Sequence, residues 1–323
     1  MMTILITGVA GHIGSNIANR LLGEGNEVVG VDNFITGSKE NLKILLSNPK
    51  FVFIKASIEE QWLKDELAAY HFEEIYHLAC PTGVPNLERL SEEMLSATSI
   101  GTRNILKIAQ EHKSRFLLAS SSEVYGEPNI FPQTEEYTGN VQPTGMRSPY
   151  EEGKRFSESL VAAFVRKHKL DAKIARIFNT YGPNMSWADQ RVVPRFLDQA
   201  LNGKALTVHG GGLQRRTLLY IDDLVSGLVL ILRGGDSGEI YNIGSDKECS
   251  ILEVANLILK LTNSKSKILF TQRPPHDHQA RMPSLEKVNK LGWQPKTSLE
   301  LGLQKTLESL KEKIEEDLQT QVS

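Results

Sequence analysis

The stretch TILITGVAGHIGSNIANRLLGEG, residues 3–25, decides the fold of this chain. Residues 3–7 form a short β-rich apolar run, a glycine-rich turn follows at once, and an amphipathic helical pattern begins after the turn. In this context Gly8 permits a tight turn, Gly11 lets the backbone approach a pyrophosphate, and Gly14 allows close packing of helix on strand. The spacing is GxxGxxG rather than GxGxxG. The order of strand, turn and helix predicts a dinucleotide-binding unit.

Asp32 supports this prediction from the end of the next apolar run, EVVGV at residues 27–31. A carboxylate at the end of the second strand of such a unit accepts hydrogen bonds from the adenosine ribose. The same carboxylate repels a 2′-phosphate, so Asp32 favours NAD over NADP.

Strand and helix patterns alternate through the first half of the chain, which predicts an α/β fold with a Rossmann-type doubly wound parallel sheet. Further strands are expected at residues 51–55, 74–80, 115–123, 173–178 and 239–244, and helices at about 59–70, 92–112, 191–203 and 222–234, with one more helix that begins at residue 148. We expect a NAD-binding domain at residues 1–178, rejoined by about 214–244. Residues 179–213 and 245–323 are expected to form a smaller α/β domain that binds the substrate.

The run RFLLASSSEVYG at residues 115–126 reads as a buried strand whose last residues are polar. Open α/β sheets place their chemistry at such strand exits. Downstream, SPYEEGK predicts a helix start in which Ser148 caps, Pro149 takes the first position and Glu151 completes a capping box.

Tyr150 and Lys154 lie four residues apart and therefore on one face of this helix. A phenol with a pKa of about 10 is a poor base at neutral pH. An ammonium one turn away and a cationic nicotinamide ring both favour the phenolate. Tyr150 is thus predicted to take a proton from a sugar hydroxyl while hydride leaves the same carbon.

Composition excludes several classes of function. The 323 residues carry a net charge of -2, which gives no electrostatic reason to expect nucleic acid or a membrane surface as partner. Cys80 and Cys249 are expected to be free thiols. No apolar run is long enough to span a bilayer and the first strand begins at Thr3, so a cytoplasmic protein is expected.

Several histidines and arginines of the chain are candidates for binding a metal or an anion. His77 is expected to be a satisfied core residue. The run His276, Asp277, His278 in a proline-rich loop is interpreted as solvated, so no metal is expected. Arginines near predicted loops indicate a site for a diphosphate or carboxylate, because guanidinium groups bind both bidentately. These arginines are Arg191, Arg216 and Arg281.

With TGVAGHIG, VDNFITG, LLASSSEVYGEP, RSPYEEGKR, ARIFNTYGP, RVVPRF and GWQP in this order, the chain resembles the extended short-chain dehydrogenase/reductases that act on nucleotide sugars. Within that family it is most similar to the UDP-glucuronate decarboxylases. The resemblance runs from residue 3 to about residue 310.

The resemblance implies roles for five residues. Ser121 would hydrogen-bond the sugar's 4-hydroxyl, and Tyr150 would act as the base toward it. Lys154 would hold the nicotinamide ribose and lower the pKa of the phenol. Glu123 would assist at C5, directly or through water, and Arg281 would face the sugar carboxylate.

The resemblance also implies two sets of binding residues and a homodimer formed through the face that includes the Tyr150 helix. The residues implied for NAD are Gly8, Gly11, His12, Ile13, Gly14, Asp32, Asn33, Ser57, Ile58, Leu78, Ala79, Tyr150 and Lys154. Those implied for the UDP-sugar are Pro81, Asn179, Arg191, Val192, Arg216 and Arg281. The chain departs from the family pattern at His12, usually Phe, at Ser57, commonly Asp, and in the loop Cys80, Thr82, Gly83.

The implied activity is NAD-dependent decarboxylation of UDP-glucuronate to UDP-xylose through a 4-keto intermediate, with NAD regenerated in the cycle. A nucleotide-sugar 4-epimerase, a 4,6-dehydratase and a non-catalytic NAD-binding regulator are the alternatives. One branch of dehydratases has an acidic Asp where Ser122 stands here, and a serine is no comparable acid. Another branch of the 4,6-dehydratases also has Ser at this position, so Ser122 excludes only part of the dehydratases.

Overall fold

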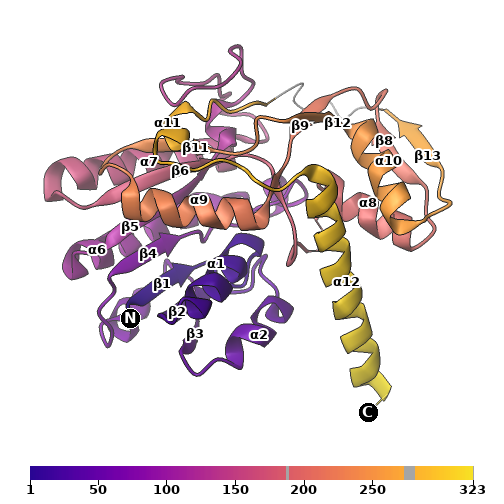
Figure 1. Ribbon diagram of the computed structural model, residues 1–323. Helices are drawn as coiled ribbons and strands as arrows, with labels where there is room; N and C mark the ends of the chain where they lie inside the picture. The colour runs from indigo at the N-terminus through magenta and orange to yellow at the C-terminus, as the bar shows by residue number, and fades with distance from the viewer. Residues whose placement is uncertain (187–188, 273–280, 323) are drawn as a thin grey trace.

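A computed structural model describes residues 1–186, 189–272 and 281–322 of the chain. Its centre is a seven-stranded parallel sheet in the order β11-β6-β5-β4-β1-β2-β3 (Figure 1). The strands are β1 (Thr3–Thr7), β2 (Glu27–Asp32), β3 (Phe51–Lys55), β4 (Glu74–His77), β5 (Arg115–Ser121), β6 (Ala172–Ile177) and β11 (Ile240–Ile243). This confirms the predicted doubly wound sheet, including the return of the chain to it as β11.

The strand order reverses at β1. From β1 the chain builds β2 and β3 on one side, and then crosses to build β4, β5 and β6 on the other. In open α/β sheets ligands bind in the crevice beyond the carboxyl ends of the strands at such a switch point. Thr7, Asp32, His77 and Ser121 are the last residues of β1, β2, β4 and β5, and the side chains of Asp32 and Ser121 lie at this crevice.

Helices cover both faces of the sheet because successive strand side chains point to opposite faces. Ile4 and Ile6 pack in a core with α1 (His12–Gly23) and α9 (Ile221–Gly234). Leu5 packs on the other face with α6 (Thr102–His112) and with Val161 of α7 (Ser148–His168). As predicted, His77 is a core residue, and its ring nitrogens contact the hydroxyls of Thr7 (2.8 Å) and Thr102 (3.1 Å).

Two predicted helices differ from the observed ones. The helix expected over residues 92–112 is divided into α5 (Ser91–Ser96), a π-helical turn at Ala97–Gly101, and α6. The helix expected over residues 59–70 is shorter, as α3 (Trp62–Leu67). The remaining short helices are α2 (Lys43–Leu46), α4 (Asn86–Arg89), α11 (Glu286–Lys290) and the 3-10 turns Lys39–Leu42 and Ser122–Tyr125.

The predicted capping box of α7 is wrong. The N-cap is Arg147 rather than Ser148, and no side chain caps this helix end. A preceding turn causes the difference, since the Ser148 N–H donates to the Gly145 carbonyl (2.9 Å) and Ser148 is already helical. Glu151 instead accepts a hydrogen bond from Nε of Arg147 (3.2 Å).

A smaller lobe lies beside the sheet (Figure 1). In it β8 (Leu206–His209) pairs in parallel with β13 (Ile268–Thr271), and α8 (Val192–Leu201) packs on α10 (Ile251–Thr262). The pairs β7 (Thr180–Tyr181) with β10 (Leu219–Tyr220) and β9 (Arg215–Thr217) with β12 (Glu248–Ser250) connect it to the sheet, and α12 (Leu299–Val322) ends the chain. The domain boundaries given above stay a prediction.

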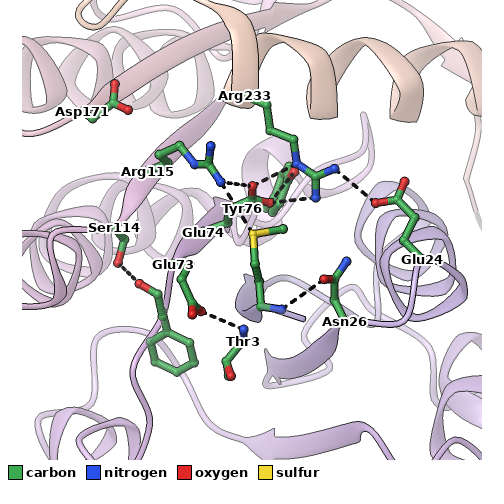
Figure 2. Close-up of polar contacts among 12 residues, drawn as sticks. Thr3, Glu24, Asn26, Glu73, Glu74, Tyr76, Ser114, Arg115, Asp171 and Arg233 are labelled. Atoms are coloured by element: carbon green, nitrogen blue, oxygen red, sulfur yellow. Dashed lines mark hydrogen bonds and ion pairs between the residues drawn. The ribbon is translucent and has the colours of Figure 1, made fainter.

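At the amino ends of the strands, opposite the crevice, a buried carboxylate binds two arginines (Figure 2). Glu74 has no solvent exposure and accepts hydrogen bonds from Arg115 (2.8 Å) and Arg233 (2.9 and 3.2 Å). The hydroxyl of Tyr76 donates to the same carboxylate (3.2 Å), and Arg233 also pairs (3.2 Å) with Glu24, which caps the C-terminus of α1. These contacts connect β4, β5, α9 and α1.

The cysteines and the helix lengths can be compared with the expectations from the sequence. Cys80 and Cys249 carry free thiols, as predicted. Within the described ranges no helix combines the length and apolar character that crossing a bilayer requires.

Candidate active site

A cavity of about 880 Å³ lies at the carboxyl ends of β1, β2, β4 and β5. All the residues predicted to bind NAD, from Gly8 to Lys154, line it together with Ser121 and Glu123. Of the predicted substrate residues, Pro81, Asn179 and Arg191 line the cavity. Val192, Arg216 and Arg281 are absent from its lining: Val192 begins α8, and the Arg216 guanidinium donates to the Arg215 carbonyl in β9 (2.8 Å).

The turn between β1 and α1 needs glycine at two positions, because larger residues there would not fit against the neighbouring backbone. Gly8 has φ +75°, a conformation that favours glycine. A Cβ on Gly14 would lie 2.2 Å from the carbonyl oxygen of Gly8, so only glycine lets α1 start this close to β1. The first turn of α1 therefore presents its free N–H groups at the cavity, as the pyrophosphate of a dinucleotide requires. The residues present fit NAD here.

Asp32 is held rigidly at the same end of the cavity. Its carboxylate accepts hydrogen bonds from the N–H groups of Ala10 (2.9 Å) and Phe34 (2.8 Å). Burial raises the pKa of Asp32, and these backbone donors act against that rise. Nearby, the Asn33 amide donates to the Ser57 hydroxyl (2.7 Å). Carboxylate oxygens accept more than one bond each, so Asp32 keeps acceptor capacity for ribose hydroxyls.

Tyr150, Lys154 and Ser121 meet in the cavity beside the end of β5. Burial raises the pKa of Tyr150 above its ordinary value, whereas a hydrogen bond with Ser121 lowers it. The Lys154 ammonium donates to the Ala119 carbonyl (2.8 Å) and lies 5.9 Å from the centroid of the Tyr150 ring. The charges of Cys80 and Glu123 raise the pKa of Tyr150 further, so the lowered phenol pKa expected from Lys154 is not a property of the chain alone.

Glu123 is the most strongly paired carboxylate of the cavity. Both terminal nitrogens of the Arg281 guanidinium contact it, one at 3.0 Å, and Nη2 of Arg147 lies 2.5 Å from its Oε2. Burial alone favours the neutral acid, but the charges of Arg281 and Arg147 outweigh it and hold the pKa of Glu123 well below its usual range. Glu123 is therefore ionised in this structure.

Arg147 is the functional candidate that the sequence reasoning missed. It lines the cavity and contacts both Glu123 and Glu151. A signal was present, because Arg147 stands four residues before Glu151, at the spacing of a helical ion pair. The run His276 to His278 lies outside the described residues.

Arg191 and His12 meet at the far side of the glycine turn. Arg191 makes a bidentate ion pair with Asp189 (2.8 and 2.5 Å). Burial, and then the charge of Arg191, lowers the pKa of His12 to about 3, so its ring is neutral. Among the described residues Nε2 of His12 is a buried nitrogen without a hydrogen-bond partner.

Comparison with known proteins agrees with this geometry. The sequence profile of the NAD dependent epimerase/dehydratase family matches residues 4–244. UDP-glucuronic acid decarboxylase 3 of Arabidopsis thaliana is 44% identical over 94% of this chain and 87% of that protein. UDP-glucuronic acid decarboxylase 1 of Xenopus tropicalis is 40% identical over 98% of this chain and 74% of that protein.

Solved structures show the same architecture with ligands. UDP-glucose 4-epimerase from Thermotoga maritima, determined with UDP-glucose, superposes with a TM-score of 0.89 at 28% identity, covering 97% of this chain and 100% of that one. dTDP-glucose 4,6-dehydratase from Streptomyces venezuelae, determined with NAD and TYD, gives 0.86 at 28% identity, covering 96% and 97%. With the family profile spanning the sheet and the cavity, this chain belongs to the NAD dependent epimerase/dehydratase family.

Proposed function

We propose that this chain is an NAD-dependent decarboxylase that converts UDP-glucuronate to UDP-xylose through a 4-keto sugar. The observation that carries the proposal is the pairing of Glu123 with Arg281 beside Tyr150, because it places a guanidinium suited to a carboxylate near the base. The names of the curated relatives support the same reaction.

The glycine turn and Asp32 would hold NAD, the cofactor of this family, which would supply reversible acceptance of a hydride from C4 of the sugar. The chain supplies the base and the hydrogen-bond donor that hydride transfer requires at the 4-hydroxyl of the sugar. We assign Tyr150 as the base that removes the 4-hydroxyl proton and Ser121 as the donor that orients this hydroxyl. Since burial raises the pKa of Tyr150, its phenolate depends on positive charge held close by, which Lys154 provides from the same helix face.

The second half of the reaction follows from the position of the new ketone. The sugar carboxylate is then β to a carbonyl, so carbon dioxide leaves and its electrons delocalise into an enolate. We assign Arg281 to the carboxylate and Glu123 to C5. Because guanidinium charge keeps Glu123 ionised, it is expected to orient a water that protonates C5 rather than to donate a proton of its own.

Incubation with UDP-glucuronate and NAD is expected to release carbon dioxide and form UDP-xylose, as measured by trapping labelled carbon dioxide. Arg281→Ala and Glu123→Gln are each expected to lower this release by about 100-fold or more, because the first removes the cation assigned to the sugar carboxylate and the second removes the carboxylate that orients water at C5. The matched control is Arg20→Ala, which removes an exposed arginine that pairs with Glu24 and lies outside the cavity lining.

Rival activities give different outcomes in the same assay. Epimerisation of UDP-glucose without turnover of UDP-glucuronate would assign the chain to the 4-epimerases. Loss of water from dTDP-glucose would assign it to the 4,6-dehydratases, and NAD binding without any turnover would favour the regulator.

We also propose a homodimer formed through α5 and α7. Apolar side chains are exposed on this part of the surface, with Leu95 at 46%, Ile100 at 55% and Phe156 at 51% exposure. Leu95 and Phe156 line one surface hollow. A second copy of the chain would bury these side chains. We further propose a cytoplasmic location, which the two free thiols support.

Phe156→Glu is expected to convert the protein from dimer to monomer, because it places a charge in the apolar centre of the contact. Sedimentation equilibrium measures the mass directly. Ile44→Glu is the control, since Ile44 is also an exposed apolar residue but lies on α2. A wild-type monomer, or a Phe156→Glu dimer, would contradict the proposal.

A further inference from the structure

The Glu123 carboxylate stands between Arg281 and the cavity. Glu123 lines the cavity, whereas Arg281 lies behind it with only 5% of its surface exposed. Both terminal guanidinium nitrogens of Arg281 bind Glu123. In this structure, therefore, the face of Arg281 that a ligand would use is already occupied by a carboxylate of the chain.

A ligand carboxylate and Glu123 compete for this face. A guanidinium binds one carboxylate bidentately through a given pair of N–H groups, so a second carboxylate can take that position only when the first one moves. Moving Glu123 into the cavity without a cation is costly, because a buried charge without a partner destabilises strongly.

Arg147 provides the alternative cation. Its Nη2 already lies 2.5 Å from Oε2 of Glu123, and its own side chain lines the cavity. The Arg147 Nε is held by Glu151 (3.2 Å), which fixes the guanidinium at the start of α7. Glu123 can thus leave Arg281 and stay paired with Arg147.

On the basis of the function proposed above, we propose that Glu123 is an internal competitor for the position of the substrate carboxylate on Arg281, and that Arg147 is the positioning residue that retains Glu123 when the substrate takes that position. Arg147 acts through Glu123 and needs no contact with the sugar. In this exchange the substrate carboxylate replaces Glu123 on Arg281, and Glu123 moves to a position beside C5 of the sugar.

The test compares two ligands in a Tyr150→Phe background, which prevents turnover during calorimetry with NAD present. UDP-glucuronate carries the carboxylate, and UDP-glucose carries an uncharged hydroxymethyl group instead. Adding Glu123→Gln is expected to tighten UDP-glucuronate binding by about tenfold, because the competitor loses its charge. Binding of UDP-glucose is expected to change by less than about threefold, and it also reports correct folding of each variant.

Arg147 variants test the second half of the proposal. Arg147→Gln is expected to weaken UDP-glucuronate binding by about tenfold, because it removes the cation that would retain Glu123 when Glu123 leaves Arg281. Arg147→Lys keeps a cation and is expected to stay near the affinity of the parent. In the Glu123→Gln variant, adding Arg147→Gln is expected to have no further effect, since Arg147 acts only through the charge of Glu123.

The exchange is overturned if Glu123→Gln weakens UDP-glucuronate binding or shifts both ligands equally. It is also overturned if Arg147→Gln has its full effect without Glu123. Carbon dioxide release by the wild type separates these results from failure of the proposed function. Release together with equal shifts refutes the exchange alone, whereas no release from UDP-glucuronate refutes both.

Discussion

Tyr150→Phe is expected to lower kcat for carbon dioxide release by about 10²–10⁴-fold, the usual contribution of a positioned general base. The substitution removes one hydroxyl from a half-buried ring and leaves the carbon atoms that pack unchanged. Affinities for NAD and UDP-glucuronate are therefore expected to stay within about threefold of the wild type. Steady-state kinetics and calorimetry measure the two effects separately.

Tyr70→Phe is the matched control, because Tyr70 is a half-buried phenol outside the cavity lining. Its kcat is expected to equal that of the wild type. Retention of activity within about tenfold by Tyr150→Phe would remove Tyr150 from the role of base.

The double variant Arg115→Ala, Arg233→Ala is expected to lower the free energy of unfolding by about 3–5 kcal/mol, because it leaves Glu74 as a buried charge without a cation. The contacts that it removes connect two strands and two helices at the sheet edge opposite the cavity (Figure 2). Urea unfolding followed by circular dichroism measures the loss.

Two further variants show whether the buried charge is the cause. Adding Glu74→Gln to the double variant is expected to restore part of the stability, since a neutral amide is less costly to bury. Lys64→Ala removes the exposed pair with Glu111 and is expected to cost less than about 1 kcal/mol. Equal losses from Lys64→Ala and from the double variant would contradict the account of Glu74.

The sequence predicted those parts of the fold that depend on residues close together in the chain. The turn at Gly8 to Gly14, the carboxylate at Asp32 and the apolar run of β5 each carry their own signal, so the doubly wound sheet followed from them. The start of α7 failed for a local reason, because the turn at Gly145 makes Ser148 helical and leaves it unable to cap.

The charge environment of the site was not predictable in the same way. Arg281 and Glu123 are 158 positions apart, and their contact exists only because Arg281, shortly before α11, lies beside the end of β5. The raised pKa of Tyr150 results from burial, which a helical spacing of four residues does not reveal. Glu74 depends on the meeting of β4, β5 and α9, so no pattern in the sequence indicated it.

The central claim is that one active site oxidises C4, removes the carboxylate and restores C4 within a single cycle. The most direct measurement uses UDP-glucuronate deuterated at C4 and follows the UDP-xylose product by NMR, with absorbance reporting any reduced cofactor. The account predicts deuterium retained at C4 of UDP-xylose and no net formation of NADH. Product without the label, or NADH that accumulates in step with carbon dioxide, would contradict it.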